Sequence, residues 1–228
     1  MTAPVGPPPP APAAPLTVFA GPMFAGKTTE LLRRIAAARD AGLLVAVAKP
    51  ARDTRYSAAH LVSHTGLCVE AVPVGRAEDL LALANRAVVR AISNDVGGDE
   101  ERAARAARGG VVEVEPLPTA SRPIDLLAID EIHFFAADAV APIAALRAQG
   151  VAVVVAGCDL DHFGEVFAPF DALLPLATEV VRLTGDCARC GAPSTHSERL
   201  VAATERIIVG GAAEFVATCA ACFRPSRR

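Results

Sequence analysis

One short stretch sets the architecture of this chain: Gly21-Pro22-Met23-Phe24-Ala25-Gly26-Lys27-Thr28. It matches the phosphate-loop pattern G-x-x-x-x-G-K-[S/T] at every position. The apolar run at residues 16–20 predicts a buried strand before the loop, and the spacing of apolar residues after Lys27 predicts a helix. A loop of this kind between a strand and a helix is typical of an α/β fold. A glycine-rich turn that matched the pattern by chance would not be expected to lie between such a strand and such a helix.

The residue types of this loop suit a phosphate group. Gly21 and Gly26 permit tight turns that point backbone N–H groups inward, and the start of a helix adds partial positive charge. Lys27 brings a mobile ammonium group to the β- and γ-phosphates, and the hydroxyl of Thr28 is a ligand for Mg²⁺. We therefore predict that residues 21–28 hold ATP with its magnesium ion.

Apolar runs and helical spacing alternate along the rest of the chain. This alternation predicts a mostly parallel sheet with helices on both faces, of the phosphate-loop NTPase type. The expected strands cover residues 43–48, 124–130 and 151–156, the expected helices cover residues 80–92 and 137–148, and an irregular polar loop is expected at residues 50–67.

Composition divides the chain into parts. Residues 1–15 are rich in proline and alanine and predict a disordered tail, with an arm that docks to a proline-binding domain as the alternative. Residues 16–184 carry the α/β pattern of a phosphate-loop domain, and residues 185–228, which carry the paired cysteines, are expected to form a small zinc-ribbon domain. Residues 93–122 combine paired glycines with an Ala/Arg-rich stretch, which predicts a flexible insert or a solvated helix, or else a lid or partner arm.

Charge and length exclude several classes of protein. The 228 residues contain 22 Lys and Arg against 25 Asp and Glu, a net charge of −3, which excludes a strongly basic nucleic-acid binder. The apolar runs are too short to span a bilayer, and the N-terminus lacks the pattern of an export signal. We therefore expect a cytoplasmic protein whose partners are small molecules rather than nucleic acid or membrane.

Two carboxylates follow the apolar run that ends at Ile129. We expect this strand to lie beside the strand at residues 16–20, so that Asp130 and Glu131 meet the phosphate loop at the carboxyl edge of the sheet. Asp130 then suits the surroundings of Mg²⁺, and Glu131 suits accepting the proton of a hydroxyl that attacks the γ-phosphorus. The alternative is a solvated turn, because acidic residues often end strands.

The chain has six cysteines, and four of them form two CxxC pairs with 28 residues between the pairs. Four thiolates complete a tetrahedral zinc shell and leave no open position, so we predict structural zinc on Cys187, Cys190, Cys219 and Cys222, pinning residues 191–218 at both ends. A redox CxxC needs a helix start, which is absent here, and a nucleic-acid ribbon needs aromatic residues, which are scarce. Cys68 and Cys158 are expected to be buried thiols.

Together these motifs resemble the type II thymidine kinases over about residues 16–223. Besides the phosphate loop, which continues with Thr29-Glu30, and the two cysteine pairs, the resemblance is carried by Lys49-Pro50-Ala51-Arg52-Asp53-Thr54-Arg55-Tyr56-Ser57, Ile129-Asp130-Glu131-Ile132-His133-Phe134-Phe135, Gly164-Glu165-Val166-Phe167 and Val209-Gly210-Gly211. The resemblance implies a kinase that transfers the γ-phosphoryl group of ATP to the 5′-hydroxyl of thymidine, for nucleotide salvage in DNA synthesis. It also implies a homotetramer that is inhibited by dTTP, the thymidine triphosphate end product.

The resemblance also implies roles for particular residues. Glu131 becomes the catalytic base and Asp130 a magnesium partner, while His133, Arg55 and Asp53 lie near the nucleotide phosphates and the sugar. The stretch between the cysteine pairs corresponds to the family's lasso, which closes over the base. The implied nucleoside contacts are Phe134, Phe167, Ser197, Ile208 and Phe215.

Some positions depart from the family pattern. His133 stands where the family has glutamine, Cys158 where it has leucine, Val166 where it has proline, and His162 near a usual pocket phenylalanine. The phosphate half of the pattern therefore matches better than the base half. A nucleoside kinase of another base specificity stays open as an alternative, as does a phosphate-loop ATPase or switch.

Overall fold

A computed structural model describes residues 12–53, 60–62, 67–85, 123–202 and 204–226. Its centre is a six-stranded sheet in the order β5-β2-β6-β7-β1-β8, and every neighbouring pair in it is parallel. The predicted α/β class with a mostly parallel sheet is therefore confirmed. In chain order the strands of this sheet are β1 (Leu16–Ala20), β2 (Val45–Pro50), β5 (Val72–Val74), β6 (Leu126–Ile129), β7 (Ala152–Gly157) and β8 (Glu179–Arg182).

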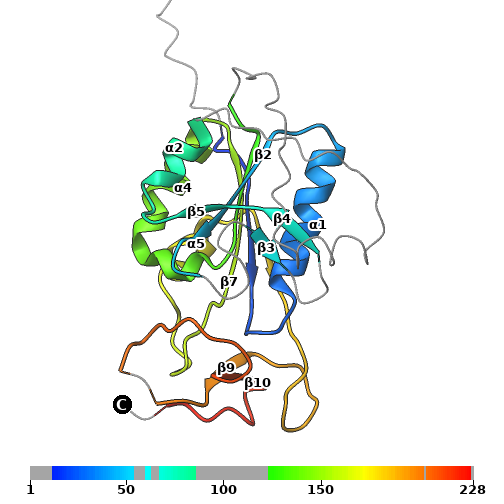
Figure 1. Cartoon of the computed structure of the whole chain (residues 1–228), viewed down its shortest axis with the longest axis vertical. Helices are drawn as coiled ribbons and strands as arrows, with labels where there is room; N and C mark the ends of the chain where they lie inside the picture. The colour runs from blue at the N-terminus through cyan, green and yellow to red at the C-terminus, as the bar shows by residue number, and fades with distance from the viewer. Residues whose placement is uncertain (1–11, 54–59, 63–66, 86–122, 203, 227–228) are drawn as a thin grey trace, which may run out of the picture.

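Helices cover both faces of the sheet (Figure 1). One face packs against α1 (Lys27–Asp40) and a small hairpin of β3 (His60–Val62) and β4 (Cys68–Glu70). The other face packs against α2 (Asp79–Asn85), the 3₁₀ segment η1 (Ile132–Ala139), α4 (Val140–Ala148) and α5 (Phe170–Leu176). These two layers cover the faces of the sheet in the described part of the chain, so the ends of the strands are the natural place for a binding site.

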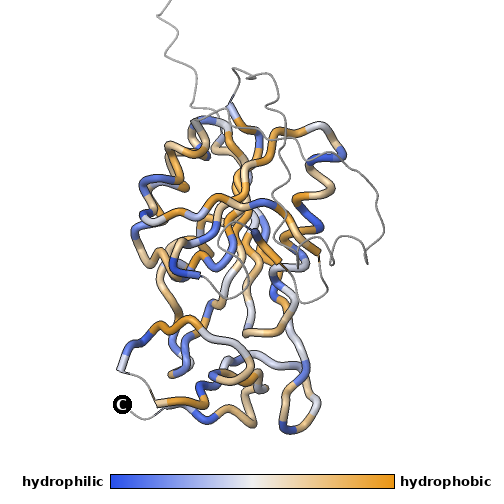
Figure 2. The backbone as a smooth tube through the Cα atoms, in the orientation of Figure 1, coloured by the Kyte–Doolittle hydropathy of each residue, from blue (hydrophilic) through white to orange (hydrophobic). Residues whose placement is uncertain are grey.

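The strands alternate their side chains between the two layers. In β1, Leu16, Val18 and Ala20 join the core on the α2, α4 and α5 side, while Phe19 joins the core under α1. Because both faces are covered, the central strands read as continuous apolar runs rather than as alternating ones. Figure 2 shows the same pattern as apolar colour along the middle of the sheet.

A second, two-stranded sheet lies at one end of the molecule, below the main sheet in Figure 1. It pairs β9 (His196–Arg199) with β10 (Phe215–Thr218) in antiparallel fashion. Both cysteine pairs belong to this region, one before β9 and one directly after β10. The arrangement is consistent with the predicted zinc ribbon.

The order of the strands corrects one expectation. The acidic strand β6 does not lie beside β1, because β7 pairs with both of them: Val154 is opposite Ala128 on one side and Thr17 on the other. All three strands are parallel, so their carboxyl ends still meet at one edge. Asp130 therefore reaches the phosphate loop across the end of β7.

Local structure corrects three more expectations. The loop expected at residues 50–67 contains β3, whose Leu61 is buried, and Cys68 on the partner strand is exposed rather than buried. The helix expected at residues 137–148 is preceded by the 3₁₀ turns of η1.

Some predictions fall outside the described residues. The helix expected at residues 80–92 is described only as far as Asn85, and the insert at residues 93–122, most of the N-terminal tail and Arg55 are not described. In the part of the chain that the structure describes, no helix is both long and apolar enough to cross a membrane.

Candidate active site

The phosphate loop follows β1 and opens α1, as its sequence predicts. Gly21 has φ +150°, and a Cβ atom there would lie 2.2 Å from the carbonyl oxygen of Leu183, so only glycine fits. Gly26 has φ +78° and caps α1, and its carbonyl accepts the N–H of Glu30 at 3.0 Å. The backbone of the loop is therefore fixed at both glycines, which leaves the start of α1 available to an anion.

Lys27 is buried at the inner side of this loop. Its ammonium group donates to the carbonyl oxygen of Pro22 at 2.6 Å and to the sulfur of Cys158 at 3.5 Å. Cys158 directly follows β7, so the ammonium lies over the carboxyl end of the central strands. This is the position from which a cation can meet phosphates held by the loop.

The acidic pair joins the phosphate loop through one hydrogen bond. The hydroxyl of Thr28 donates to Oδ2 of Asp130 at 2.9 Å, and the backbone N–H of Glu131 donates to Oδ1 at 3.0 Å. Burial, followed by the nearby charge of Glu131, raises the pKa of Asp130 to about 7, although the Thr28 hydroxyl opposes this shift. A buried carboxylate beside a second one calls for a cation, and a hydroxyl with a carboxylate is an oxygen donor set that suits Mg²⁺.

Glu131 adopts a left-handed backbone (φ 48°, ψ 43°) as the turn into η1 begins. Its Oε2 lies 3.4 Å from Nδ1 of His133. The His133 ring stacks on Phe167 with centroids 5.2 Å apart and lies 4.4 Å from the ring of Phe134. This packing fixes the imidazole next to the carboxylate.

A cleft that is partly open to solvent lies between the carboxyl edge of the main sheet and the β9–β10 ribbon. Its empty space, counted with its open mouth, is about 450 Å³. The cleft brings together the predicted residues Glu131, His133, Phe134, Phe167, Ser197, Ile208 and Phe215, with Met23 from the phosphate loop.

The ribbon contacts the phosphate loop directly. The backbone N–H of Met23 donates to the hydroxyl of Ser197 on β9 at 2.9 Å. The predicted site residue Asp53 is elsewhere: it is buried, its Oδ2 lies 4.0 Å from Nζ of Lys49, and it is not among the residues that line the cleft. The structure therefore unites the ribbon and the phosphate loop around one space, but it does not bring Asp53 to that space.

The four paired cysteines form a compact cluster. The four sulfur atoms all lie within 4.8 Å of one another, and those of Cys190 and Cys219 are 3.6 Å apart. Four sulfurs bound to zinc at about 2.3 Å are separated by about 3.8 Å, so the spacing fits a tetrahedral site.

The thiol chemistry of the cluster fits a cation as well. Backbone hydrogen bonds, led by that of Cys219, lower the pKa of Cys187 to about 6. Hydrogen bonding with Cys190 is the largest of the effects that raise the pKa of Cys222 to about 12. Without a cation the four thiols cannot all ionise together, so the cluster could hold a metal ion that compensates their charge.

Comparison with known proteins identifies the family. The family described as "Thymidine kinase" matches residues 14–102 and 111–223. The chain belongs to the thymidine kinase family. A thymidine kinase of Deinococcus radiodurans is 38% identical over 186 residues, which is 82% of this chain and 76% of that protein. Two other thymidine kinases are similar over a greater share of this chain. That of Deinococcus deserti is 35% identical, over 90% of this chain and 91% of that protein. That of a Rhodothermus strain is 32% identical, over 93% of this chain and 82% of that protein.

This thymidine kinase family member also has cleft residues that its sequence did not single out. Besides Leu160 and Ile207, they include the charged residues Asp161, Arg199 and Arg206. Asp161 had a usable signal, because it follows a buried strand at the edge where parallel sheets bind ligands. The two arginines carried no such signal beyond their place between the cysteine pairs, since ribbon arginines are usually solvated.

Proposed function

We propose that this protein transfers the γ-phosphoryl group of ATP to the 5′-hydroxyl of thymidine, which yields dTMP and ADP for nucleotide salvage. One observation carries the proposal. Glu131 lines the cleft while its neighbour Asp130 accepts a hydrogen bond from Thr28 of the phosphate loop. A carboxylate at this junction can accept the proton of an alcohol in the cleft as that alcohol attacks a phosphate held by the loop.

The phosphate half works by positioning and charge. Backbone N–H groups of residues 21–28 and the ammonium of Lys27 hold the β- and γ-phosphates and neutralise charge on the transferred group. Thr28 and Asp130 would hold Mg²⁺, which when bound adds further neutralisation. Glu131 then accepts the proton of the 5′-hydroxyl as its oxygen attacks the phosphorus in line.

The nucleoside half works by shape. Phe134, Phe167 and Phe215 give the cleft flat apolar walls, which suit a methylated pyrimidine. Ser197 and Ile208 complete the contacts on the ribbon side. Asp53 and Arg55 are proposed to act near the sugar and phosphates when the site is filled.

The remaining features of the proposal concern the whole protein. Residues 16–184 form the kinase domain and residues 185–228 the zinc ribbon, in which Cys187, Cys190, Cys219 and Cys222 hold a structural Zn²⁺. Residues 1–15 are a tail and residues 93–122 an insert. By analogy with the family, the protein is a cytoplasmic homotetramer that dTTP inhibits.

A turnover assay tests the proposal. ATP consumption and dTMP formation are measured with thymidine, deoxyuridine and deoxycytidine side by side. We expect turnover with thymidine and no hydrolysis of ATP without a nucleoside. Equal ATP hydrolysis with and without nucleoside would support the ATPase alternative, and a preference for deoxycytidine would support a different base specificity.

A further inference from the structure

One wall of the cleft is a strap, here defined as residues 204–210, which runs between β9 and β10. The cleft-lining residues of the strap are Arg206, Ile207, Ile208 and Gly210. The strap has no regular secondary structure. Its position over the cleft must therefore come from side-chain contacts at its ends and along its length.

The first contact comes from β9. The Arg199 side chain donates to the carbonyl oxygen of Glu205 at 2.8 Å and to that of Arg206 at 2.7 Å. These bonds order the backbone of the strap relative to the ribbon. They do not connect the strap to the main sheet on the other side of the cleft.

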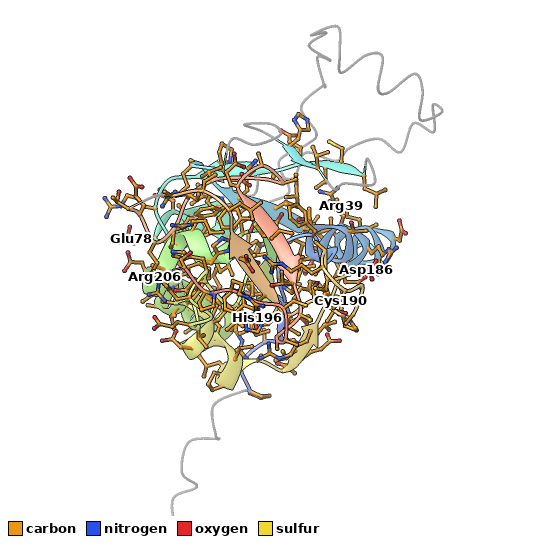
Figure 3. All side chains as sticks on the ribbon, turned by 90° about the horizontal axis from the view of Figure 1, so that it is seen from below. Arg39, Glu78, Asp186, Cys190, His196 and Arg206 are labelled. Atoms are coloured by element: carbon orange, nitrogen blue, oxygen red, sulfur yellow. The ribbon has the colours of Figure 1, made fainter. Side chains whose placement is uncertain are left out.

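The second contact makes that connection. Nε of Arg206 donates to Oδ2 of Asp161, in the loop after β7, at 2.6 Å. Nη2 of Arg206 also lies 2.6 Å from this oxygen. Its guanidinium also lies 3.7 Å from a carboxylate oxygen of Glu165 and 5.7 Å from the ring centre of Phe167. The labelled Arg206 lies on the opposite side of the ribbon from the labelled Cys190 of the metal-binding cluster (Figure 3).

Asp161 is built to receive this arginine. Its side chain is fully buried, and Oδ1 accepts the backbone N–H groups of Phe163 and Glu165, both at 2.9 Å. Those bonds hold the carboxylate in one orientation and leave Oδ2 facing the strap. A buried carboxylate that loses a cationic partner is costly, so the pair favours the closed position of the strap.

We propose that Arg206 and Asp161 form a latch that fastens the strap across the nucleoside cleft, which makes Arg206 a positioning residue for the nucleoside. The inference rests on the proposed function for the identity of the nucleoside. The latch acts through the wall formed by Ile207 and Ile208, and the described contacts of Arg206 include none with the phosphate loop. Breaking the latch therefore weakens nucleoside binding and leaves the ATP site as it was.

Steady-state kinetics test the consequence for binding. We expect Arg206→Met and Asp161→Asn each to raise KM for thymidine about tenfold, which corresponds to about 1.4 kcal/mol, with kcat and KM for ATP within about twofold. Glu165→Gln is the matched control, because it removes a neighbouring carboxylate at the longer distance, and its KM should stay within about twofold. The double variant should be no worse than the worse single variant, as for two halves of one contact.

Limited proteolysis tests the latch without any substrate. A glutamyl endopeptidase cuts after Glu205, which is exposed on the strap. Asp161→Asn leaves the sequence at that bond unchanged, so a roughly tenfold faster release of the fragment ending at Glu205 reports a loosened strap. Thermal denaturation of the same samples separates local loosening from global unfolding, and Arg206→Met, at a half-exposed position, keeps the test available if Asp161→Asn does not fold.

The outcomes are distinct. Wild-type cleavage rates in Asp161→Asn, or equal rises of KM for thymidine and ATP in Arg206→Met, would overturn the latch. A wild-type protein that does not phosphorylate thymidine would overturn the proposed function instead, and the cleavage rates would still decide whether the latch exists.

Discussion

Lys27 is the single residue on which phosphate binding depends most. Its buried ammonium lies on the phosphate loop, bonded to Pro22 and close to Cys158. Lys27→Met keeps the apolar stem and removes the charge, so we expect turnover to fall about 10³-fold, as when one preorganised donor is lost, with an unchanged circular dichroism spectrum. Turnover within tenfold of wild type would contradict the assignment of this loop to the phosphates.

Glu131 has a role that separates catalysis from binding. Because a general base acts in the transition state, Glu131→Gln should lower kcat about 10²- to 10⁴-fold and leave the Kd for ATP nearly unchanged. Asp138→Asn, at an exposed position of the same η1 segment, is the matched control and should behave as wild type. Equal losses in kcat and ATP affinity would indicate a role in nucleotide binding instead.

Single residues also show where the sequence is informative. Asp130 and Glu131 could be predicted because both sit in one short motif after an apolar strand. The pair of Arg206 with Asp161 could not, because it joins positions 45 residues apart and neither residue belongs to a pattern that fixes its partner. Contacts of that kind depend on how elements pack, which local spacing does not record.

The close packing of η1 against the end of β7 can be tested at one glycine. β7 ends at Gly157, where a Cβ atom would lie 3.0 Å from Nδ1 of His133 and 3.2 Å from the backbone nitrogen of Ile132. Gly157→Ala should therefore push η1 away, destabilise the protein by about 1–3 kcal/mol and lower turnover. Gly75→Ala, which meets nothing within 4 Å, is the control; equal melting temperatures for the two variants would contradict this packing argument.

The ribbon carries a pH-dependent contribution to stability. Glu198 on β9 accepts hydrogen bonds from Arg189 at 2.6 and 2.7 Å, and this arginine lowers the pKa of Glu198 below its ordinary value of 4.5. A lowered folded-state pKa gives stability that is fully present above pH 4.5 and is lost as the pH falls below it. The difference in melting temperature between wild type and Glu198→Gln should therefore shrink on acidification, and a constant difference would contradict the linkage.

Elements were predictable in kind but not in arrangement. Continuous apolar runs predicted β1, β6 and β7, since buried parallel strands need no alternation. Their order could not be predicted, because the position of β7 between β6 and β1 is set by tertiary packing and not by the local sequence. The hairpin of β3 and β4 was missed because its short strands lie in a polar stretch, and their stability comes from packing against the core under α1.

At the scale of the whole molecule, the cleft depends on the ribbon keeping its place against the α/β body. The contacts that span the two parts beside the cleft include those of Met23 with Ser197 and of Arg206 with Asp161. Both originate in the stretch that the cysteine cluster holds at its two ends. The substrate site is thus shared between a phosphate-binding half with a rigid sheet behind it and a nucleoside-binding half whose order depends on the cluster.

Removal of the metal tests this dependence. If the cluster holds zinc, a chelator should lower the melting temperature and raise KM for thymidine more than KM for ATP, because the ribbon loosens while β1, the phosphate loop and α1 stay packed. Added Zn²⁺ should reverse both changes, with Mg²⁺ kept in excess throughout. Cys219→Ser should reproduce the chelated state, whereas Cys68→Ser, remote from the cluster in sequence, should not. About one zinc per chain is expected by elemental analysis, and a fully active protein that contains none would show that hydrogen bonds and packing alone order the ribbon.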